Sequence, residues 1–125
     1  MRFFLFAALV MLWPAAATAC NACKEDKIAA TYDWQVVSAA KEHGHTVVFT
    51  AIQGKLAPHD AALAQALRRK LGALHGVDPG TVRVSLAPPA ASFAIGTSPA
   101  SVLSAANRAL APSGLSLTIV RVGAP

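Results

Sequence analysis

The chain has 125 residues, a hydrophobic fraction of 54% and a formal net charge of +5. Its basic residues are spread along the sequence with few aromatic residues beside them, which gives nucleic-acid binding little support. No paired carboxylates, nucleophile–base triad or phosphate-binding loop stands out, so a hydrolase or transferase function has no residues to rest on.

The N-terminus has the pattern of a secretory signal peptide, which we place at residues 1–19. Met1-Arg2 supplies the positive charge, residues 3–13 are apolar, and Ala17-Thr18-Ala19 supplies the small residues that precede a cleavage site. The apolar run is shorter than the roughly 20 residues needed to span a bilayer. We therefore expect an exported protein, periplasmic or secreted, whose mature part begins at Cys20.

Residues 20–44 are predicted to form a Cys-x-x-Cys motif followed by one amphipathic helix, from Lys24 to Glu42. The apolar residues of this segment recur every four positions, at Ile28, Tyr32, Val36 and Ala40. This period is typical of a helix that buries one side.

The stretch from His45 to Ile52 is predicted to be a central β-strand. Alternate residues of a strand point to opposite faces of the sheet, so Val47 and Phe49 face one way and Val48 faces the other. Both faces are apolar, and we therefore expect helices to cover the strand on both sides.

The rest of the chain is predicted to alternate helices and strands. The elements are a helix from about Asp60 to Leu74 that Asp60 caps, strands at Thr81–Leu86 and Ala91–Ile95, a helix starting at Ser98-Pro99, and a strand at Leu115–Val122. The densest basic group, Arg68-Arg69-Lys70, falls on the polar side of a helix, where a solvated face is the usual explanation. The order predicts an α+β protein with a ferredoxin-like βαββαβ sandwich over residues 45–125. The N-terminal helix is expected to cover the open face of its sheet.

Several core positions of this region follow a known family pattern. They are Thr46-Val47-Val48, the leucines 63, 67 and 71 with His75-Gly76-Val77, Thr81-Val82-Arg83-Val84, and Ser98-Pro99. With them, the chain from about Thr46 to Val122 resembles the heavy-metal-associated (HMA) domain of copper chaperones and metal-transporting ATPases. The resemblance implies a ferredoxin-like fold and metal binding by a Cys-x-x-Cys in the loop between the first strand and the first helix. The corresponding positions fall near Asp60 and Leu63, and neither is a cysteine. The family's metal ligands therefore do not carry over to this chain.

Both cysteines of the chain lie in one motif, Cys20-Asn21-Ala22-Cys23. Two thiolates suit a soft metal such as Cu(I), or Zn(II) with further ligands. The predicted helix would be about 28 Å long at ~1.5 Å per residue. The strand that follows would run back over about 26 Å at ~3.3 Å per residue, so it would end near the start of the helix. We therefore predict a metal site of Cys20 and Cys23, with His59 in the loop after the strand as an added candidate ligand. The predicted function is an exported, non-enzymatic, soft-metal-binding protein of HMA-like type that binds or transfers the ion, to a partner protein, by thiolate exchange.

Other hypotheses remain open for the cysteines. In an oxidising compartment they form a disulfide, and the chain is then a structural or interaction module without metal. A thiol pair before a helix also fits a thiol-disulfide oxidoreductase, although no thioredoxin-like strand precedes it. Residues 17–20 are similar to a poor lipobox, and a lipidated Cys20 would tie the protein to a membrane. His43, His45 and His75 lie at the opposite end of the predicted fold, where capping or surface roles are the usual explanation.

Overall fold

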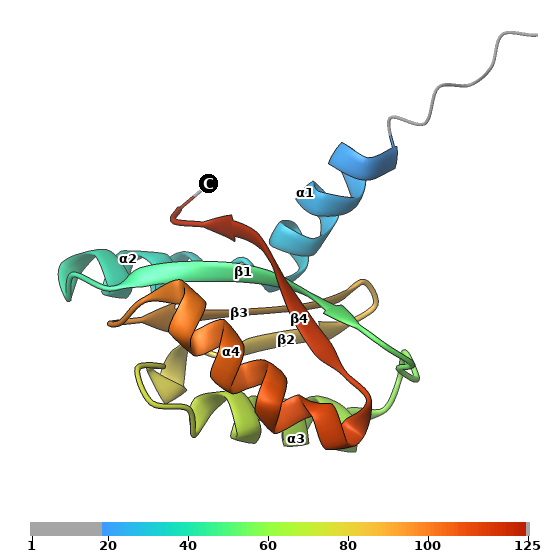
Figure 1. Cartoon of the computed structure of the whole chain (residues 1–125). Coiled ribbons are helices and arrows are strands. Elements are labelled where there is room, and N and C mark those ends of the chain that lie inside the picture. Colours follow the sequence, from blue (N-terminus) through green and yellow to red (C-terminus); the bar gives the residue numbers. More distant parts are fainter. Residues whose placement is uncertain (1–18, 125) are drawn as a thin grey trace, which may run out of the picture.

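The computed structural model describes residues 19–124, with side chains from Lys24 onward, so the predicted signal peptide up to residue 18 lies outside the described residues. Four strands form one sheet in the order β2-β3-β1-β4, and all neighbouring strands are antiparallel (Figure 1). Their bounds are β1 Thr46–Gln53, β2 Arg83–Leu86, β3 Pro89–Ile95 and β4 Ser116–Val122.

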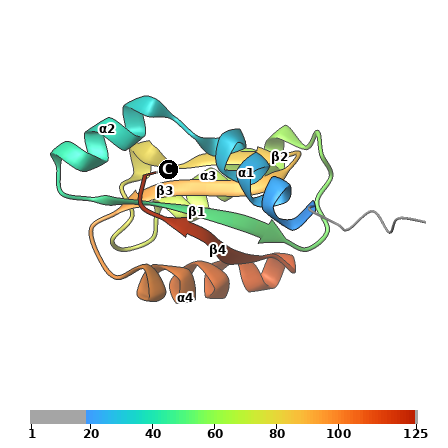
Figure 2. The same ribbon diagram turned by 90° about the horizontal axis from the view of Figure 1, so that it is seen from above.

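Helices cover both faces of this sheet. Their bounds are α1 Ala19–Thr31, α2 Trp34–Glu42, α3 Ala61–Gly72 and α4 Pro99–Leu110. Two of them, α3 and α4, lie on one face, and α1 and α2 lie on the other (Figures 1 and 2). The predicted α+β class is confirmed, and the strand order is compatible with a ferredoxin-like sandwich. Within the described range, no helix is long and apolar enough to cross a membrane.

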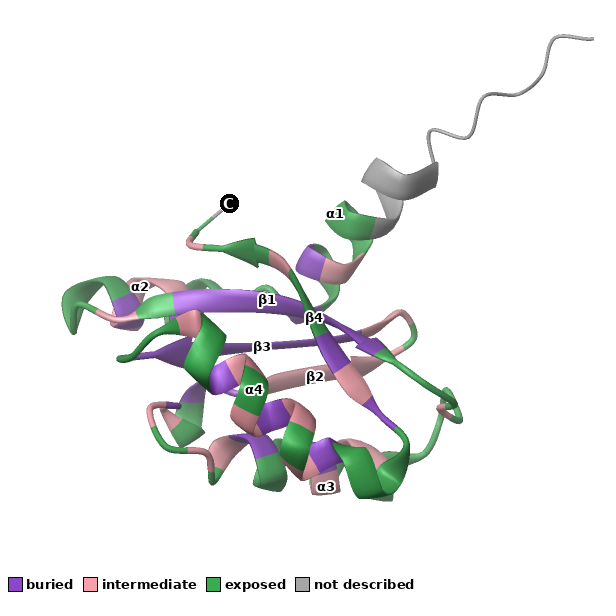
Figure 3. Ribbon diagram, viewed as in Figure 1, coloured by how far each residue is buried: buried purple, intermediate pink, exposed green. Residues whose placement is uncertain are grey.

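The central strand β1 behaves as its two apolar faces predict. Every residue from Val47 to Ile52 is buried (Figure 3). Val48 and Ile52 belong to the larger core beneath α3 and α4, whereas Val47 and Phe49 belong to a smaller core beneath α1 and α2. Burying apolar side chains on both faces is what makes this strand the centre of the fold.

The predicted cap of α3 is confirmed, since the Asp60 carboxylate accepts a hydrogen bond from the Leu63 N–H at 3.0 Å. The strand predicted to begin at Thr81 begins later, because Pro79–Thr81 forms a short 3-10 helix capped by Asp78. The Thr81 hydroxyl donates to the Asp78 carbonyl at 2.6 Å and accepts from the Ala94 N–H at 2.8 Å. These two bonds hold Thr81 in the turn rather than in β2.

The prediction of a single helix from Lys24 to Glu42 is wrong, because the chain breaks into α1 and α2. The Thr31 carbonyl accepts a hydrogen bond from the buried Ser92 hydroxyl at 3.0 Å. Two residues later, Asp33 has extended backbone and its carboxylate accepts from the Gln35 N–H at 2.9 Å, which caps α2. The first helix is thus fastened to β3 where it ends, and a second helix starts with its own cap.

The break also changes which residues of the predicted stripe are buried. Ile28, Val36 and Ala40 are buried as expected, but Tyr32 lies between the helices and is 45% exposed. Near its C-terminal end α1 packs on the sheet through Ile28 and Thr31, while residues 24–26 are exposed. In Figure 1 the helix rises away from the sheet toward its N-terminal end.

The outer edge of β4 is protected by a side chain from α4. The Asn107 carboxamide accepts from the Leu117 N–H at 2.7 Å and donates to the Leu117 carbonyl at 3.2 Å. A register shift opposite Phe49 and Thr50 interrupts the regular ladder further along β4. An unpaired edge invites strand pairing between molecules, and both features make this edge a poor template.

Candidate functional site

The two cysteines lie at the N-terminal end of α1. The helix contacts the sheet near its other end. Positions i and i+3 of a helix fall on the same side. Their side chains lie outside the described residues, so the predicted ligand set stays a prediction.

The prediction that His59 joins Cys20 and Cys23 used one straight helix, and the fold replaces that helix with α1 and α2. The chain still runs out and back, since the N-terminal end of α1 and the loop between β1 and α3 lie at the same end of the sheet (Figure 2). His59 is exposed in the turn before α3, and α3 lies on the face of the sheet opposite α1 (Figure 1). Among the side chains that the structure describes, no group of three or more histidine, cysteine and acidic residues has the spacing to hold a metal ion. That search does not reach the side chains of Cys20 and Cys23.

The histidines at the opposite end of the fold lie as the sequence predicts. The ring centroids of His43 and His45 are 6.3 Å apart, and the ring planes are inclined at 49°. Gly96 connects His45 to the region of His75. The His45 ring lies beside Gly96, since a Cβ built on Gly96 would be 3.2 Å from His45 Nε2, and the Gly96 N–H donates to the carbonyl of Gly76, which directly follows His75. The three histidines therefore share one end of the molecule without forming a described metal-binding group.

The segment between α1 and α2 contains one member of an ion pair, with an exposed aromatic residue directly before it and another directly after it. Arg83 Nε on β2 donates to the Asp33 carboxylate at 3.1 Å. This hydrogen bond, together with the one from the Gln35 N–H, holds the pKa of Asp33 below its ordinary value. On either side of Asp33, Tyr32 is 45% exposed and Trp34 is 69% exposed. Sequence reasoning missed this feature, although an Asp before a helical stretch is a recognised start signal.

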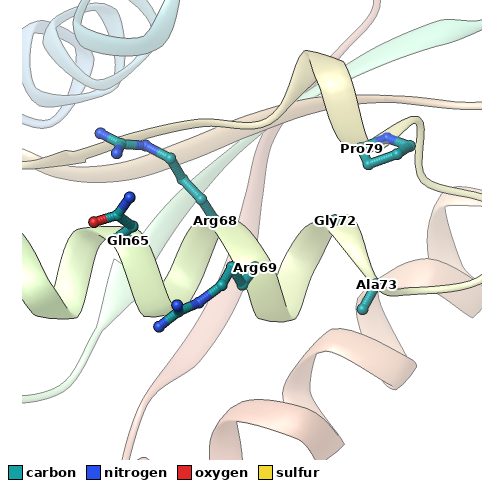
Figure 4. Close-up of a pocket in the computed structure, with 6 residues that line it drawn as sticks. All are labelled: Gln65, Arg68, Arg69, Gly72, Ala73 and Pro79. Carbon is teal, nitrogen blue, oxygen red and sulfur yellow. The ribbon is translucent and has the colours of Figure 1, made fainter.

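A groove of about 500 Å³ runs between α3 and the turn that contains Pro79 (Figure 4). It is lined by Gln65, Arg68, Arg69, Gly72, Ala73 and Pro79. The sequence predicted only a solvated basic face here, because nothing local places the Pro79 turn beside Gly72. A second, smaller groove of about 200 Å³ lies between α2, the start of β1 and residues 123–124.

Comparison with known proteins adds no relative. No protein-family model matches the chain, and a search of curated proteins found no match. The resemblance to the HMA domain therefore rests on the residue pattern alone.

Proposed function

We propose that this chain is a small, exported, non-enzymatic protein of HMA-like type that binds a soft metal ion, Cu(I) or Zn(II), through Cys20 and Cys23. The observation that carries the proposal is the Cys-x-x-Cys spacing at the start of α1. The positive end of a helix dipole favours the thiolate form, which is the form that binds metal. The scaffold is compatible with the ferredoxin-like sandwich to which the resemblance points.

The position of α1 supports a role in metal transfer. Ligand exchange between two proteins needs donor atoms that a second protein can approach. The segment from Lys24 to Asp26, directly after the motif, is exposed, and Ile28 is the first buried residue among the side chains of α1 that the structure describes. An exposed segment directly after the motif suits exchange with a partner protein that carries its own soft ligands.

Metal titration of the reduced protein tests the proposal. Under anaerobic conditions, Cu(I) and Zn(II) are added in competition with a chromophoric chelator. We expect uptake of a single ion per chain, loss of uptake in Cys20→Ser and Cys23→Ser, and unchanged uptake in the control His43→Ala. A weaker affinity of His59→Ala would make His59 a ligand, whereas an unchanged affinity would remove it from the site. Equal uptake by the wild type and both serine variants would refute the proposal.

One observation favours a second candidate, an interaction module whose cysteines form a disulfide. Trp34 is 69% exposed and stands beside Tyr32, and exposed aromatic residues of this kind are frequent in protein interfaces. The mass of the mature protein from its native compartment separates the two candidates. A bound metal lost on denaturation supports the metal site, and a metal-free chain lighter by two hydrogens supports the module. A disulfide that turns over a test substrate would instead indicate an oxidoreductase, and added acyl mass would identify a lipoprotein.

A further inference from the structure

The two layers of helices that cover the sheet differ in charge. The segments that contain α3 and α4, residues 54–82 and 97–115, carry five basic and two acidic residues, a formal charge of +3. Residues 19–45, which contain α1 and α2 on the opposite face of the sheet, carry three basic and four acidic residues, a formal charge of −1. The positive charge is therefore concentrated on the side of α3 and α4.

The basic residues of this side are spread over the outer surface of both helices. Leu67 and Leu71 of α3 are buried, and the three residues between them are all exposed. Because successive helical residues are about 100° apart, these three side chains fan out over the solvent side of α3. Lys70 Nζ donates to Ser113 Oγ, just after α4, at 3.2 Å, and a further arginine is exposed on α4 itself. We call the surface formed by these four side chains the basic face: Arg68, Arg69, Lys70 and Arg108.

No acidic residue neutralises the basic face within the part of the chain that the structure describes. The salt bridge found there joins Arg83 on β2 to Asp33 before α2. The acidic residues near the two ends of α3 are engaged by backbone groups, since the carboxylates of Asp60 and Asp78 each accept a hydrogen bond from a backbone N–H. The potential in front of α3 and α4 therefore attracts anions.

The spread of the charges favours a large anionic surface over a small anion. In Figure 4, the side chains of Arg68 and Arg69 extend to different sides of α3. A single small anion would therefore meet only one of them. The long stems of arginine and lysine can bend toward a common plane while the charged ends stay in water, so an extended anionic surface can engage several at once.

The uncharged residues of the same surface argue against a protein partner. The exposed large hydrophobic side chains among the described residues are Tyr32, Trp34, Ile119 and Val122, and none of them belongs to α3 or α4. The exposed uncharged residues of these two helices are alanine, serine and glutamine only. Interface cores between proteins are enriched in aromatic residues and methionine and depleted in lysine, serine and alanine. Lipid headgroups, in contrast, need no apolar complement to attract basic residues.

We propose that the basic face docks the protein on an anionic lipid surface, with α3 and α4 against the headgroups. Attraction to such a surface grows with each basic residue that approaches it, and the absence of exposed large apolar residues on α3 and α4 makes the binding reversible and superficial. Because α1 lies on the opposite face of the sheet, the docked protein would hold α1 on the side away from the lipid (Figure 1). This proposal does not depend on metal binding at Cys20 and Cys23.

Co-sedimentation of the mature protein with lipid vesicles tests the proposal. The vesicles contain phosphatidylcholine with about one-third phosphatidylglycerol, and vesicles of phosphatidylcholine alone serve as the neutral control. We expect binding to the anionic vesicles only, and loss of that binding from about 0.1 M to about 1 M salt, over which the Debye length falls from ~10 to ~3 Å. Equal binding to neutral vesicles would overturn the proposal. Polyglutamate at the same concentration of negative charge represents an acidic protein, and tighter binding to it than to the anionic vesicles would also overturn the lipid assignment.

Two double variants with the same net charge locate the surface. Arg69→Gln with Arg108→Gln removes one charge from each helix of the basic face and should weaken binding about 25-fold, roughly fivefold for each charge. Lys24→Gln with Lys41→Gln is the matched control, because it removes two exposed charges from α1 and α2 on the opposite face and should change binding much less. Arg69→Lys with Arg108→Lys keeps the charge and should keep the binding. Equal weakening by the two glutamine variants would show attraction to net charge alone and would refute the assignment to this face.

Discussion

The clearest test of the fold concerns Asn107, whose carboxamide stands where a neighbouring strand would otherwise pair with β4. It satisfies both the N–H and the carbonyl of Leu117, at 2.7 and 3.2 Å. Asn107→Ser keeps a similar helix propensity but leaves a side chain too short to reach both groups. Each intramolecular hydrogen bond contributes roughly 0.5–1.5 kcal/mol to stability. We therefore expect the substitution to lower the free energy of unfolding by about 1–3 kcal/mol.

Urea denaturation at neutral pH measures this loss, provided that the slope of the transition is unchanged. Arg108→Ala, a change at the next and exposed position of α4, serves as the control and should stay within about 0.5 kcal/mol of the wild type. Freeing the edge of β4 should also increase self-association at high protein concentration, which size-exclusion chromatography detects. A loss below about 0.5 kcal/mol in Asn107→Ser, with no added association, would refute the edge-capping role.

Two further predictions concern the α1–α2 junction and the turn after β1. Because Arg83 lowers the pKa of Asp33 in the folded state, the ion pair stabilises the fold above the ordinary carboxyl pKa of 3.8, and this contribution is lost as the pH falls below it. Asp33→Asn can still cap α2 but loses the ion pair, so it should be less stable than the wild type at pH 7. In thermal melts the difference in stability should shrink toward pH 2. A difference that does not change with pH would contradict this prediction. Gly54 has φ +124°, and a Cβ there would lie 2.6 Å from the Gly114 carbonyl oxygen, so Gly54→Ala should cost about 1–3 kcal/mol in urea denaturation. The control Gly80→Ala, where a Cβ would make only an ordinary contact with Asp78 Oδ1 at 3.8 Å, should change little. Equal stability of the two variants would refute the steric argument.

The sequence predicts those elements whose signals come from residues close together in the chain. The two apolar faces of residues 45–52 require cover on both sides, and Asp60 has a side chain that caps a helix by itself. The break after Thr31 depends on Ser92, which is 61 positions away, and on Arg83, which is 50 positions from Asp33. The helical period of the apolar residues continues across the break, so periodicity alone favours one helix. Only the Asp33 cap gave a local indication of two.

The same distinction applies to the candidate sites. A Cys-x-x-Cys motif can be seen in the sequence, but its distance from His59 was derived from the length of one helix, and the fold has two helices there. The groove beside α3 arises because the Pro79 turn packs against Gly72, and neither residue signals the other along the chain. Sequence patterns therefore identify which residues can do chemistry, whereas tertiary contacts decide which of them meet.

The way α1 is held has a direct consequence for the proposed metal site. Residues 24–26 of α1 are exposed and Ile28 is the first buried residue among its described side chains, so this part of the helix should open more readily than the sheet. An ion bound by Cys20 and Cys23 would bridge positions in the first turns of that helix and would favour its closed form. Metal binding is therefore expected to slow amide hydrogen exchange in α1 and to leave exchange in β1 unchanged. Slowing of both elements alike would mean that the ion stabilises the whole domain, and the cysteines would then have to lie much closer to the sheet than the end of α1 that Figure 1 shows.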